Sequence, residues 1–248
     1  MNADLGEGVT TSRLAEDESI LALVSSANIA CGFHAGDATS MRETVRAASA
    51  RGISIGGHVS YPDIPGFGRR EIGLHSSEIS RHVTVQIQAL AAVCAGESAR
   101  LAHVKPHGAL YNRAARDPAA ARAVARGIQG AGLELVLLGL AGSEMMRAAS
   151  KAGLPFASEA FVDRGYTEDL LLVPRDQPGA MIDDTDWAVA RAITLVKRKT
   201  MITREGVERP LDAASLCVHG DNPNALDLLR ALRSGLDSAG VRIAPFVS

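Results

Sequence analysis

Short apolar segments alternate with segments of helical periodicity along most of the chain, and many apolar segments run directly into polar, glycine-containing stretches. Short apolar runs predict buried strands, and i, i+3, i+4 spacing predicts amphipathic helices. We expect strands over 2–5, 53–57, 101–104, 133–138, 155–160, 216–218 and 241–244, and one more strand that ends at 28–30. We expect helices over 17–24, 41–51, 77–95, 117–130, 143–151, 185–199 and 224–238. Strands that alternate with helices indicate βαβ units and a parallel sheet.

The junctions from helix to strand share one local pattern, a small or polar residue followed by glycine and then an apolar residue. It occurs at Gly52, Gly132, Gly153 and Gly240. Glycine in a left-handed cap is typical of such αβ turns. Seven or eight βα units favour a closed or nearly closed (β/α) barrel over an open sheet. No linker or low-complexity tract divides the 248 residues, so we expect one barrel domain over 1–248.

Composition narrows the class of partner. The formal net charge is −2 and aromatic residues make up 4% of the chain, which argues against nucleic acid or anionic membrane as a partner. Cys31, Cys94 and Cys217 are an odd, widely spaced set, which fits a reducing compartment better than a disulfide framework. Because we find neither a membrane-spanning run nor a signal region at the start, we expect a cytoplasmic protein.

Polar side chains follow almost every predicted strand. They are Asp4 and Glu7, His34 and Asp37, His58 and Asp63, Lys105 and His107, Glu159 and Asp163, and His219 and Asp221. The carboxyl ends of parallel barrel strands lie on one face, which is where barrel enzymes build active sites. Five of the seven histidines fall at predicted strand ends, all but His75 and His82. This distribution favours a functional over a structural role for the group.

Asp4, His34 and His58 come from three successive predicted strands. One carboxylate and two imidazoles at a common barrel mouth could hold a divalent metal with open positions, which would activate water or polarise a carbonyl. The same groups without a metal could act as general base and acid. No short-spacing motif such as HExxH decides between these two readings.

Several basic residues are candidates for binding an anion. Lys105 lies beside His107 after an apolar lead-in, and a buried lysine could bind a substrate carboxylate or stabilise an oxyanion. Arg69 and Arg70, in a glycine-rich loop, could clamp an anion or be a solvated pair.

The stretch after residue 160 is equally open to two interpretations. Asp163, Arg164 and Arg175 form either a charged substrate site or a structural ion pair.

Cys31 and Cys217 lie near strand ends. A buried, space-filling role is the simpler interpretation for them, because a nucleophile would need a partner that favours the thiolate. The chain contains no GxSxG elbow, no GxxxxGK[ST] loop and no strand-linked GxGxxG. If the reaction uses ATP, this chain lacks the commonest motifs for holding it.

Seven motifs, in order, closely resemble the LamB/YcsF family of 5-oxoprolinase A subunits. They are NADLGEG, SSANIACGFHAGD, YPDIPGFGRR, HVKPHGALYN, GLAGSE, DRGY and CVHGDNP, which span residues 2–223. The resemblance implies a deformed TIM-like barrel related to the glycoside hydrolase/deacetylase group. It also implies ATP-dependent opening of 5-oxoproline (pyroglutamate) to L-glutamate, together with subunits B and C.

A five-membered lactam is an amide that resists water, and ATP would activate its oxygen as a phosphate ester. The resemblance implies that ATP, with Mg²⁺, is held together with the partner subunits. Lys105 or an arginine would hold the substrate carboxylate, and Asp4, His34, His58 or Glu159 would handle water or protons. The full predicted catalytic set is Asp4, Glu7, His34, His58, Lys105, His107, Glu159 and Asp163. The full substrate-binding set is Asn28, Arg69, Arg70, Arg164, Arg175, His219 and Asp221.

The chain departs from the family pattern at two positions. Val59 stands where the family typically has proline after a histidine, so we expect a less rigid loop. Leu170 follows Asp169 where the family tends to have glycine. Leucine does not readily take a positive φ, so we expect a different local turn.

Two rival functions remain open at this stage. One is a stand-alone metal-dependent hydrolase, such as a carbohydrate deacetylase, although the chain offers few aromatic platforms for sugars. The other is a non-catalytic subunit that binds a carboxylated ligand. The sequence leaves open whether the chain also forms a homo-oligomer.

Overall fold

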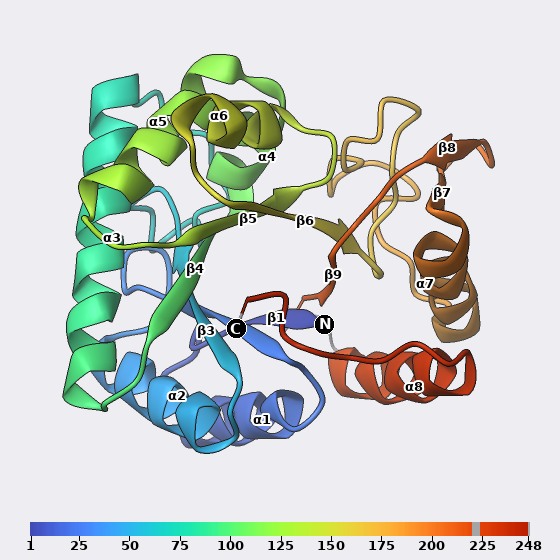
Figure 1. Cartoon of the computed structure of the whole chain (residues 1–248), viewed down its shortest axis with the longest axis horizontal. Coiled ribbons are helices and arrows are strands. Elements are labelled where there is room, and N and C mark those ends of the chain that lie inside the picture. Colours follow the sequence, from blue (N-terminus) through green and yellow to red (C-terminus); the bar gives the residue numbers. More distant parts are fainter. Residues whose placement is uncertain (220–223, 248) are drawn as a thin grey trace.

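The computed structural model describes residues 1–219 and 224–247. Within this part of the chain, seven parallel strands close into a barrel in the order β1-β2-β3-β4-β5-β6-β9, and β9 pairs with both β6 and β1. The helices surround the barrel (Figure 1). The strands are β1 (Asn2–Leu5), β2 (Ser26–Ala30), β3 (Ser54–Val59), β4 (Leu101–Pro106), β5 (Val136–Leu140), β6 (Phe156–Phe161) and β9 (Ser215–Val218). The prediction of a deformed TIM-like barrel is confirmed.

The outer layer consists of α1 (Thr11–Leu21), α2 (Ala38–Ala50), α3 (Ser76–Gly96), α4 (Gly108–Arg116), α5 (Pro118–Gly130), α6 (Glu144–Ala152), α7 (Thr185–Arg198) and α8 (Ala225–Ser238). Local chemistry sets where these helices begin. Asp37 caps α2 by accepting hydrogen bonds from the backbone of Thr39 and Ser40, and Pro118 occupies the first turn of α5. Gly52, Gly132, Gly153 and Gly240 all have positive φ, which confirms the left-handed turns predicted between helix and strand.

Some predicted elements were wrong. The first helix begins at Thr11, after an N-cap at Thr10, and not at residue 17. The segment 241–244 forms no strand, because the pairing of β9 with β1 closes the described barrel and leaves it no open edge. Sequence reasoning also missed α4 and an antiparallel hairpin of β7 (Thr200–Ile202) and β8 (Glu208–Pro210) beside α7.

The barrel interior is unusually polar. A TIM barrel normally fills this space with branched apolar side chains. Here hydrogen bonds cross the interior: the Asn2 amide donates to Glu159 and Ser215, and His103 Nε2 donates to the Asn28 amide oxygen. Gly56 has no room for a side chain, because a Cβ there would lie 2.1 Å from His103 Nε2. Apolar residues on the opposite strand faces pack under the helices.

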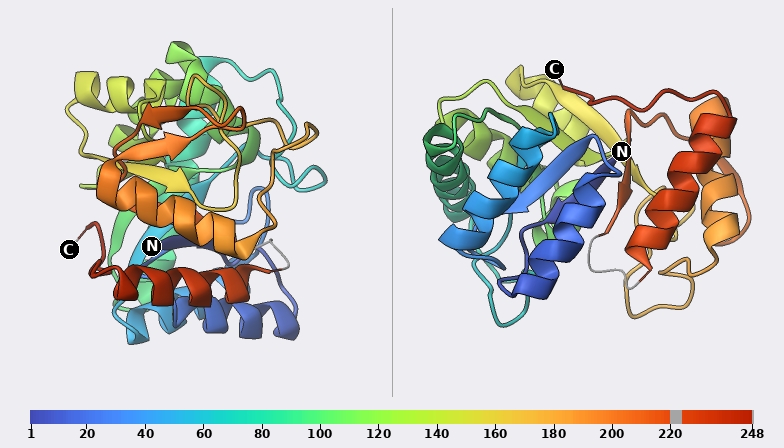
Figure 2. Two further views of the ribbon diagram at one scale, coloured as in Figure 1. Left: turned by 90° about the vertical axis from the view of Figure 1, so that its right-hand side faces the viewer. Right: turned by 90° about the horizontal axis from the view of Figure 1, so that it is seen from below.

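Two long connections extend from the same end of the barrel, the loop after β3 and the segment after β6 (Figure 2). The latter folds back on itself through bridges between Arg164 and Met181 and between Tyr166 and Leu172. At its tip Leu170 has a φ of 61°, so the expectation that leucine would avoid this conformation was wrong. Hydrogen bonds between Thr167 and Leu171 close the turn around it. No helix in the described residues is long and apolar enough to cross a membrane.

Candidate active site

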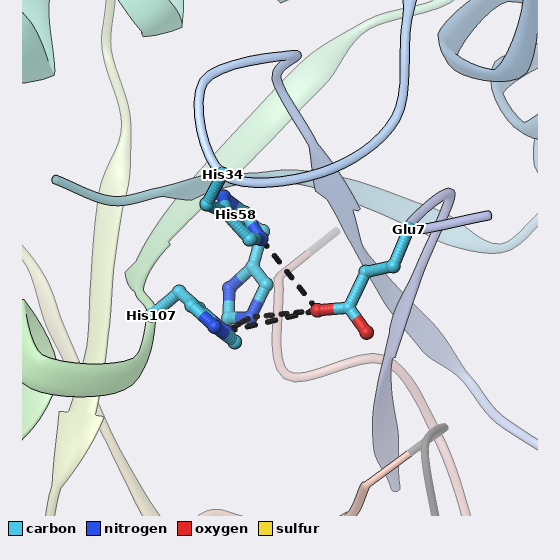
Figure 3. Close-up of side chains that lie close together, drawn as sticks. All are labelled: Glu7, His34, His58 and His107. Carbon is cyan, nitrogen blue, oxygen red and sulfur yellow. Dashed lines mark hydrogen bonds and ion pairs between the residues drawn. The ribbon is translucent and has the colours of Figure 1, made fainter. Parts of the chain in front are cut away.

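Glu7 and the histidines 34, 58 and 107 meet at the mouth of the barrel (Figure 3). Each histidine comes from the end of a different strand, and Glu7 follows β1. The Oε1 atom of Glu7 lies 3.6 Å from His34 Nε2, 4.0 Å from His58 Nε2 and 3.7 Å from His107 Nδ1. One ligand atom from each residue lies within 4.8 Å of the others. We call these four residues the histidine cluster.

Hydrogen bonds to backbone carbonyls set the tautomers of two of the rings. His58 Nδ1 lies 3.2 Å from the carbonyl oxygen of Lys105, and His107 Nε2 lies 2.9 Å from that of Phe67. A carbonyl only accepts, so each of these nitrogens carries a proton. In the neutral rings the other nitrogens therefore present lone pairs, and these two atoms, His58 Nε2 and His107 Nδ1, are only 2.9 Å apart. Such a contact calls for a shared proton or a cation.

Burial favours the neutral rings. It lowers the pKa of His34 to about 4 and, with help from the neighbouring His58 and His34, holds the pKa of His107 well below its usual range. Within the described structure, neither ring nitrogen of His34 has a hydrogen-bond partner. Imidazole nitrogens and a carboxylate are ligands that suit Zn²⁺ and related divalent metals. The residues present therefore fit a metal.

Asp4 lies beside the histidine cluster and not within it, so the ligand set predicted from sequence needs correction. Its Oδ1 accepts hydrogen bonds from Lys105 Nζ (3.0 Å) and Asn28 Nδ2 (2.8 Å), and its Oδ2 lies 3.4 Å from His58 Nε2. Burial alone would raise the pKa of Asp4, but His58 and Lys105 bring that pKa well below its usual range. Glu7 and His107 complete the cluster with His34 and His58.

Lys105 is committed to partners inside the barrel. Its ammonium contacts Asp4, Glu159 (3.1 Å) and the Cys217 sulfur (3.1 Å), and the residue is 1% exposed. Burial opposes its charge, yet Asp4 and Glu159 hold the pKa of Lys105 well above its usual range. Its ammonium already has these partners, so the arginines that line the pocket are the better candidates for holding a substrate carboxylate. Burial also raises the pKa of Cys217 and of Cys31, as expected of buried filler.

A pocket of about 290 Å³ opens beside the histidine cluster. Its walls come from strand ends, from the start of α4 and from the two long connections. Eight of the predicted site residues line it: Asp4, His58, Lys105, His107, Arg69, Arg164, Arg175 and His219. The wall also includes residues that sequence reasoning did not select, namely Phe161, Tyr111, Asn112, Leu172 and Pro174. Tyr111 and Asn112 belong to the HVKPHGALYN motif, which was the available signal for them.

His219 lies in the pocket wall, and the carboxylate of Asp163 fixes its orientation. Its Nδ1 lies 3.0 and 3.1 Å from the two carboxylate oxygens of Asp163, and its backbone N–H donates to the same carboxylate at 3.3 Å. Its ring stacks on Phe161. Asp163 is fully buried. Because an ionised carboxylate only accepts, Nδ1 carries the proton and Nε2 is the nitrogen left for a ligand.

The predicted arginines separate into two groups. Arg69, Arg164 and Arg175 line the pocket, and we call them the arginine wall. Arg164 also donates to the carbonyl oxygens of Ala180 and Val173. Burial and the nearby charge of Arg175 lower the pKa of Arg164 to about 10. Arg70 instead forms a bidentate ion pair with Asp63, so it holds the loop and does not line this pocket.

Two deeper residues have supporting positions. Asn28 bonds Asn2, Asp4 and His103, so it orients Asp4 and its donors do not face the pocket, contrary to a substrate-binding role. Glu159 is fully buried below Lys105. Asp221, also predicted to bind substrate, lies outside the described residues.

Comparison with known proteins identifies the family of this chain. The model of the LamB/YcsF family matches residues 1–248. The chain is 47% identical to the A subunit of 5-oxoprolinase from Streptomyces avermitilis, over 99% of this chain and 98% of the relative. It is also 47% identical to the A subunit of 5-oxoprolinase from Bordetella pertussis, over 98% and 96%. The crystal structure of the lactam utilization protein from Thermus thermophilus superimposes with a TM-score of 0.92 at 42% identity, covering 99% of this chain and 98% of that one. The chain therefore belongs to the LamB/YcsF family.

Proposed function

We propose that this chain is the A subunit of an ATP-dependent 5-oxoprolinase and opens the lactam ring of 5-oxoproline to give L-glutamate. The observation that carries the proposal is the lining of one pocket, which combines His58 and His107 of the histidine cluster with the three residues of the arginine wall. A carboxylated cyclic amide needs both, one for the reacting carbonyl and one for the negative charge. The relatives named as A subunits of 5-oxoprolinase support the same reaction class.

In this proposal the histidine cluster binds a divalent metal, as the facing lone pairs of His58 and His107 require a proton or a cation between them. Such a metal supplies a Lewis acid that activates water or polarises the amide carbonyl. Glu7 would contribute the charge that balances it, and the carbonyls of Lys105 and Phe67 fix the ring orientations of His58 and His107.

Proton transfer is assigned to the Asp163–His219 pair. The Nε2 atom of His219 accepts a proton from the attacking water and returns it to the ring nitrogen as the C–N bond breaks. Asp163 holds the tautomer that leaves Nε2 unprotonated and stabilises the imidazolium formed during the reaction. The arginine wall binds the substrate carboxylate by charge-assisted hydrogen bonds.

The coupling to ATP is assigned to a complex. The relatives are named as one subunit of an enzyme, which supports partner subunits, and we propose that these are subunits B and C. ATP and its Mg²⁺ would be held with those partners. Transfer of the γ-phosphoryl group to the lactam oxygen would release ADP and make the ring carbon a better electrophile. Water would add to that carbon, the C–N bond would break to leave an acyl phosphate, and a second water would release phosphate to give glutamate. The pocket here then receives the activated lactam.

The test is glutamate release from 5-oxoproline and ATP, measured with this chain alone and with subunits B and C. Activity is expected only with the partners. His107→Ala and Glu7→Gln should abolish it and lower the divalent metal content of the purified chain, whereas the control His82→Ala, outside the cluster, should change neither. Absence of glutamate under every combination would overturn the proposal.

A second function is favoured by the histidine cluster alone, because it needs no partner for metal-assisted hydrolysis. In that reading the chain is a stand-alone metal-dependent amide hydrolase, such as a carbohydrate deacetylase. Acetate release from an N-acetylated sugar by the isolated, metal-loaded chain would favour it. Saturable 5-oxoproline binding that persists in a His34→Ala variant, without turnover in any combination, would instead favour a non-catalytic binding subunit.

A further inference from the structure

Arg191 is a buried arginine that the proposed reaction does not use. It lies on α7 and is 3% exposed. Its Nη2 donates to three backbone carbonyl oxygens, those of Phe161 (3.2 Å), Val162 (2.9 Å) and Arg164 (2.7 Å). A guanidinium that donates hydrogen bonds to several main-chain carbonyl oxygens fixes the local backbone conformation, because each bond constrains a different peptide unit.

These carbonyls lie where the barrel ladder ends. The last β6–β9 pair is Phe161 with Cys217, and Val162 N–H still donates to the Cys217 carbonyl at 2.9 Å. Beyond this point the chain leaves the sheet, and Arg191 supplies donors that a strand ladder no longer provides. A buried carbonyl left without a donor destabilises the fold, so this exit depends on the arginine.

The clamped stretch carries the carboxylate that holds His219. The peptide oxygens on both sides of Asp163, from Val162 and Arg164, bind the same nitrogen of Arg191. From this position the Asp163 side chain reaches His219. The hydroxyl of Tyr166 accepts the Phe161 N–H at 2.8 Å, and the Arg191 guanidinium lies 5.8 Å from the Tyr166 ring centre.

We infer that Arg191 is a positioning residue for the Asp163–His219 pair: it fixes the backbone on either side of Asp163 and places a positive charge behind that carboxylate. This inference rests on the proposed proton-transfer role of His219. The charge is consistent with the surroundings, because burial lowers the pKa of Arg191 while Tyr166 and Asp163 act in the opposite direction. Removing the arginine should release Asp163 from the orientation that makes it accept from His219 Nδ1.

The experiment reads the tautomer of His219 in the full chain by ¹H–¹⁵N correlation of its ring nitrogens, assigned with a His219→Gln variant. The parent protein should show a protonated Nδ1. Arg191→Met should lose that signature, and Arg191→Lys, which keeps the charge and three donors, should retain at least part of it. The control Arg198→Met, on the same helix but exposed and paired with Glu208, should leave it intact.

A native His219 signature in folded Arg191→Met would overturn the inference. If that variant does not fold, Arg191→Gln decides, because it keeps an amide donor and removes the charge; an unchanged signature there also overturns it. In the complete complex, Arg191→Met should lower kcat at least tenfold with KM changed less than threefold. The tautomer does not depend on turnover, so failure of the proposed function would leave the NMR result standing, whereas failure of this inference would leave His219 essential and Arg191 dispensable.

Discussion

Adjacent side chains in one loop have different tasks. Arg69 lines the pocket, whereas Arg70 holds Asp63. The sequence showed an arginine pair in a glycine-rich loop and could not separate the two, because neither composition nor spacing reveals that Arg70 pairs with Asp63 or that Arg69 faces the pocket.

We expect Arg69→Ala to raise the KM for 5-oxoproline in the complete complex by about tenfold or more, since a charge-assisted hydrogen bond contributes roughly 1.5–3 kcal/mol. The value of kcat should change little, because the carboxylate is bound equally in the ground state and the transition state. The matched variant Arg70→Ala should leave KM unchanged. Steady-state kinetics on both proteins tests this, and equal effects on KM would contradict it.

The histidines were predicted better than their carboxylate. Their positions after strands placed His34, His58 and His107 at one mouth, as the structure shows. The predicted ligand set named Asp4 where the structure groups Glu7 and His107 with His34 and His58, because strand position gives the face that a residue reaches but not its partner. The Lys105 ammonium inside the barrel engages Asp4, and Glu7, on the loop after β1, reaches the imidazoles instead.

At the scale of elements, a single residue at a helix end makes a small contribution to the free energy of unfolding that can be measured by itself. Lys199 caps α7 with a φ of 54° and is exposed. A non-glycine residue in the left-handed region costs about 1–2 kcal/mol, part of which glycine avoids.

Lys199→Gly is therefore expected to stabilise the protein by about 0.5–1 kcal/mol, and its exposed ion pair with Asp212 contributes little against this. Lys197→Gly, two residues earlier and within the helix, should destabilise by about 1 kcal/mol. Urea denaturation of both variants measures the difference, and a loss of stability in Lys199→Gly would refute the cap argument.

Asp17 ties α1 to the loop that carries Glu7. Its Oδ2 accepts the Gly6 N–H at 2.8 Å, and burial raises the pKa of Asp17 to about 6. A raised carboxyl pKa means that the folded state binds its proton more tightly than the unfolded chain. This residue's contribution to stability therefore falls as pH rises from about 4 to 6 and costs on the order of 2–3 kcal/mol at neutral pH.

Asp17→Asn keeps an acceptor for Gly6 and removes the buried charge. We expect it to be more stable than the parent at pH 7.5 and equal to it near pH 4. Denaturation curves at both values test this, with the exposed Asp227→Asn as control. A difference that does not change with pH would speak against the buried charge.

Elements whose ends carry clear sequence signals were predicted closely, such as α5, which begins after Asp117 with Pro118 in its first turn, and the glycine turns at Gly52 and Gly153. Elements without such signals at their ends were missed. The helix α4 starts at Gly108 directly after a strand, and β7 and β8 are three residues each, too short for a period to register. The closed parallel barrel could be predicted because alternation of strands with helices allows few topologies.

At the scale of the whole molecule, the polar interior of the barrel escaped prediction. Strands are recognised in the sequence by their apolar residues, which here face the helices. The inward residues are polar and form hydrogen bonds and ion pairs with one another across the barrel. In the described part of the chain, Lys105 lies between the carboxylates of Asp4 and Glu159 at 3.0 and 3.1 Å. No pattern along the sequence encodes a contact between residues so far apart.

Lys105→Met should consequently destabilise the protein by roughly 3–5 kcal/mol, because it leaves buried carboxylates without their countercharge. The exposed Lys151→Met serves as control and should change the free energy of unfolding by less than about 0.5 kcal/mol. Chemical denaturation at neutral pH measures both. A loss below about 1 kcal/mol for Lys105→Met would show that the interior charges are balanced in another way.

The pocket wall takes groups from four strand ends: His58 and Arg69 from β3 and the loop after it, His107 after β4, Arg164 and Arg175 after β6, and His219 after β9. Three fixed contacts that do not lie on one line distinguish an object from its mirror image. In 5-oxoproline the carboxylate is attached to a stereocentre beside the ring nitrogen. If 5-oxoproline is the substrate, as proposed, we expect one enantiomer to bring its carboxylate to the arginines and its ring carbonyl to the histidines better than the other, so that the frame of the barrel selects handedness before any bond is broken.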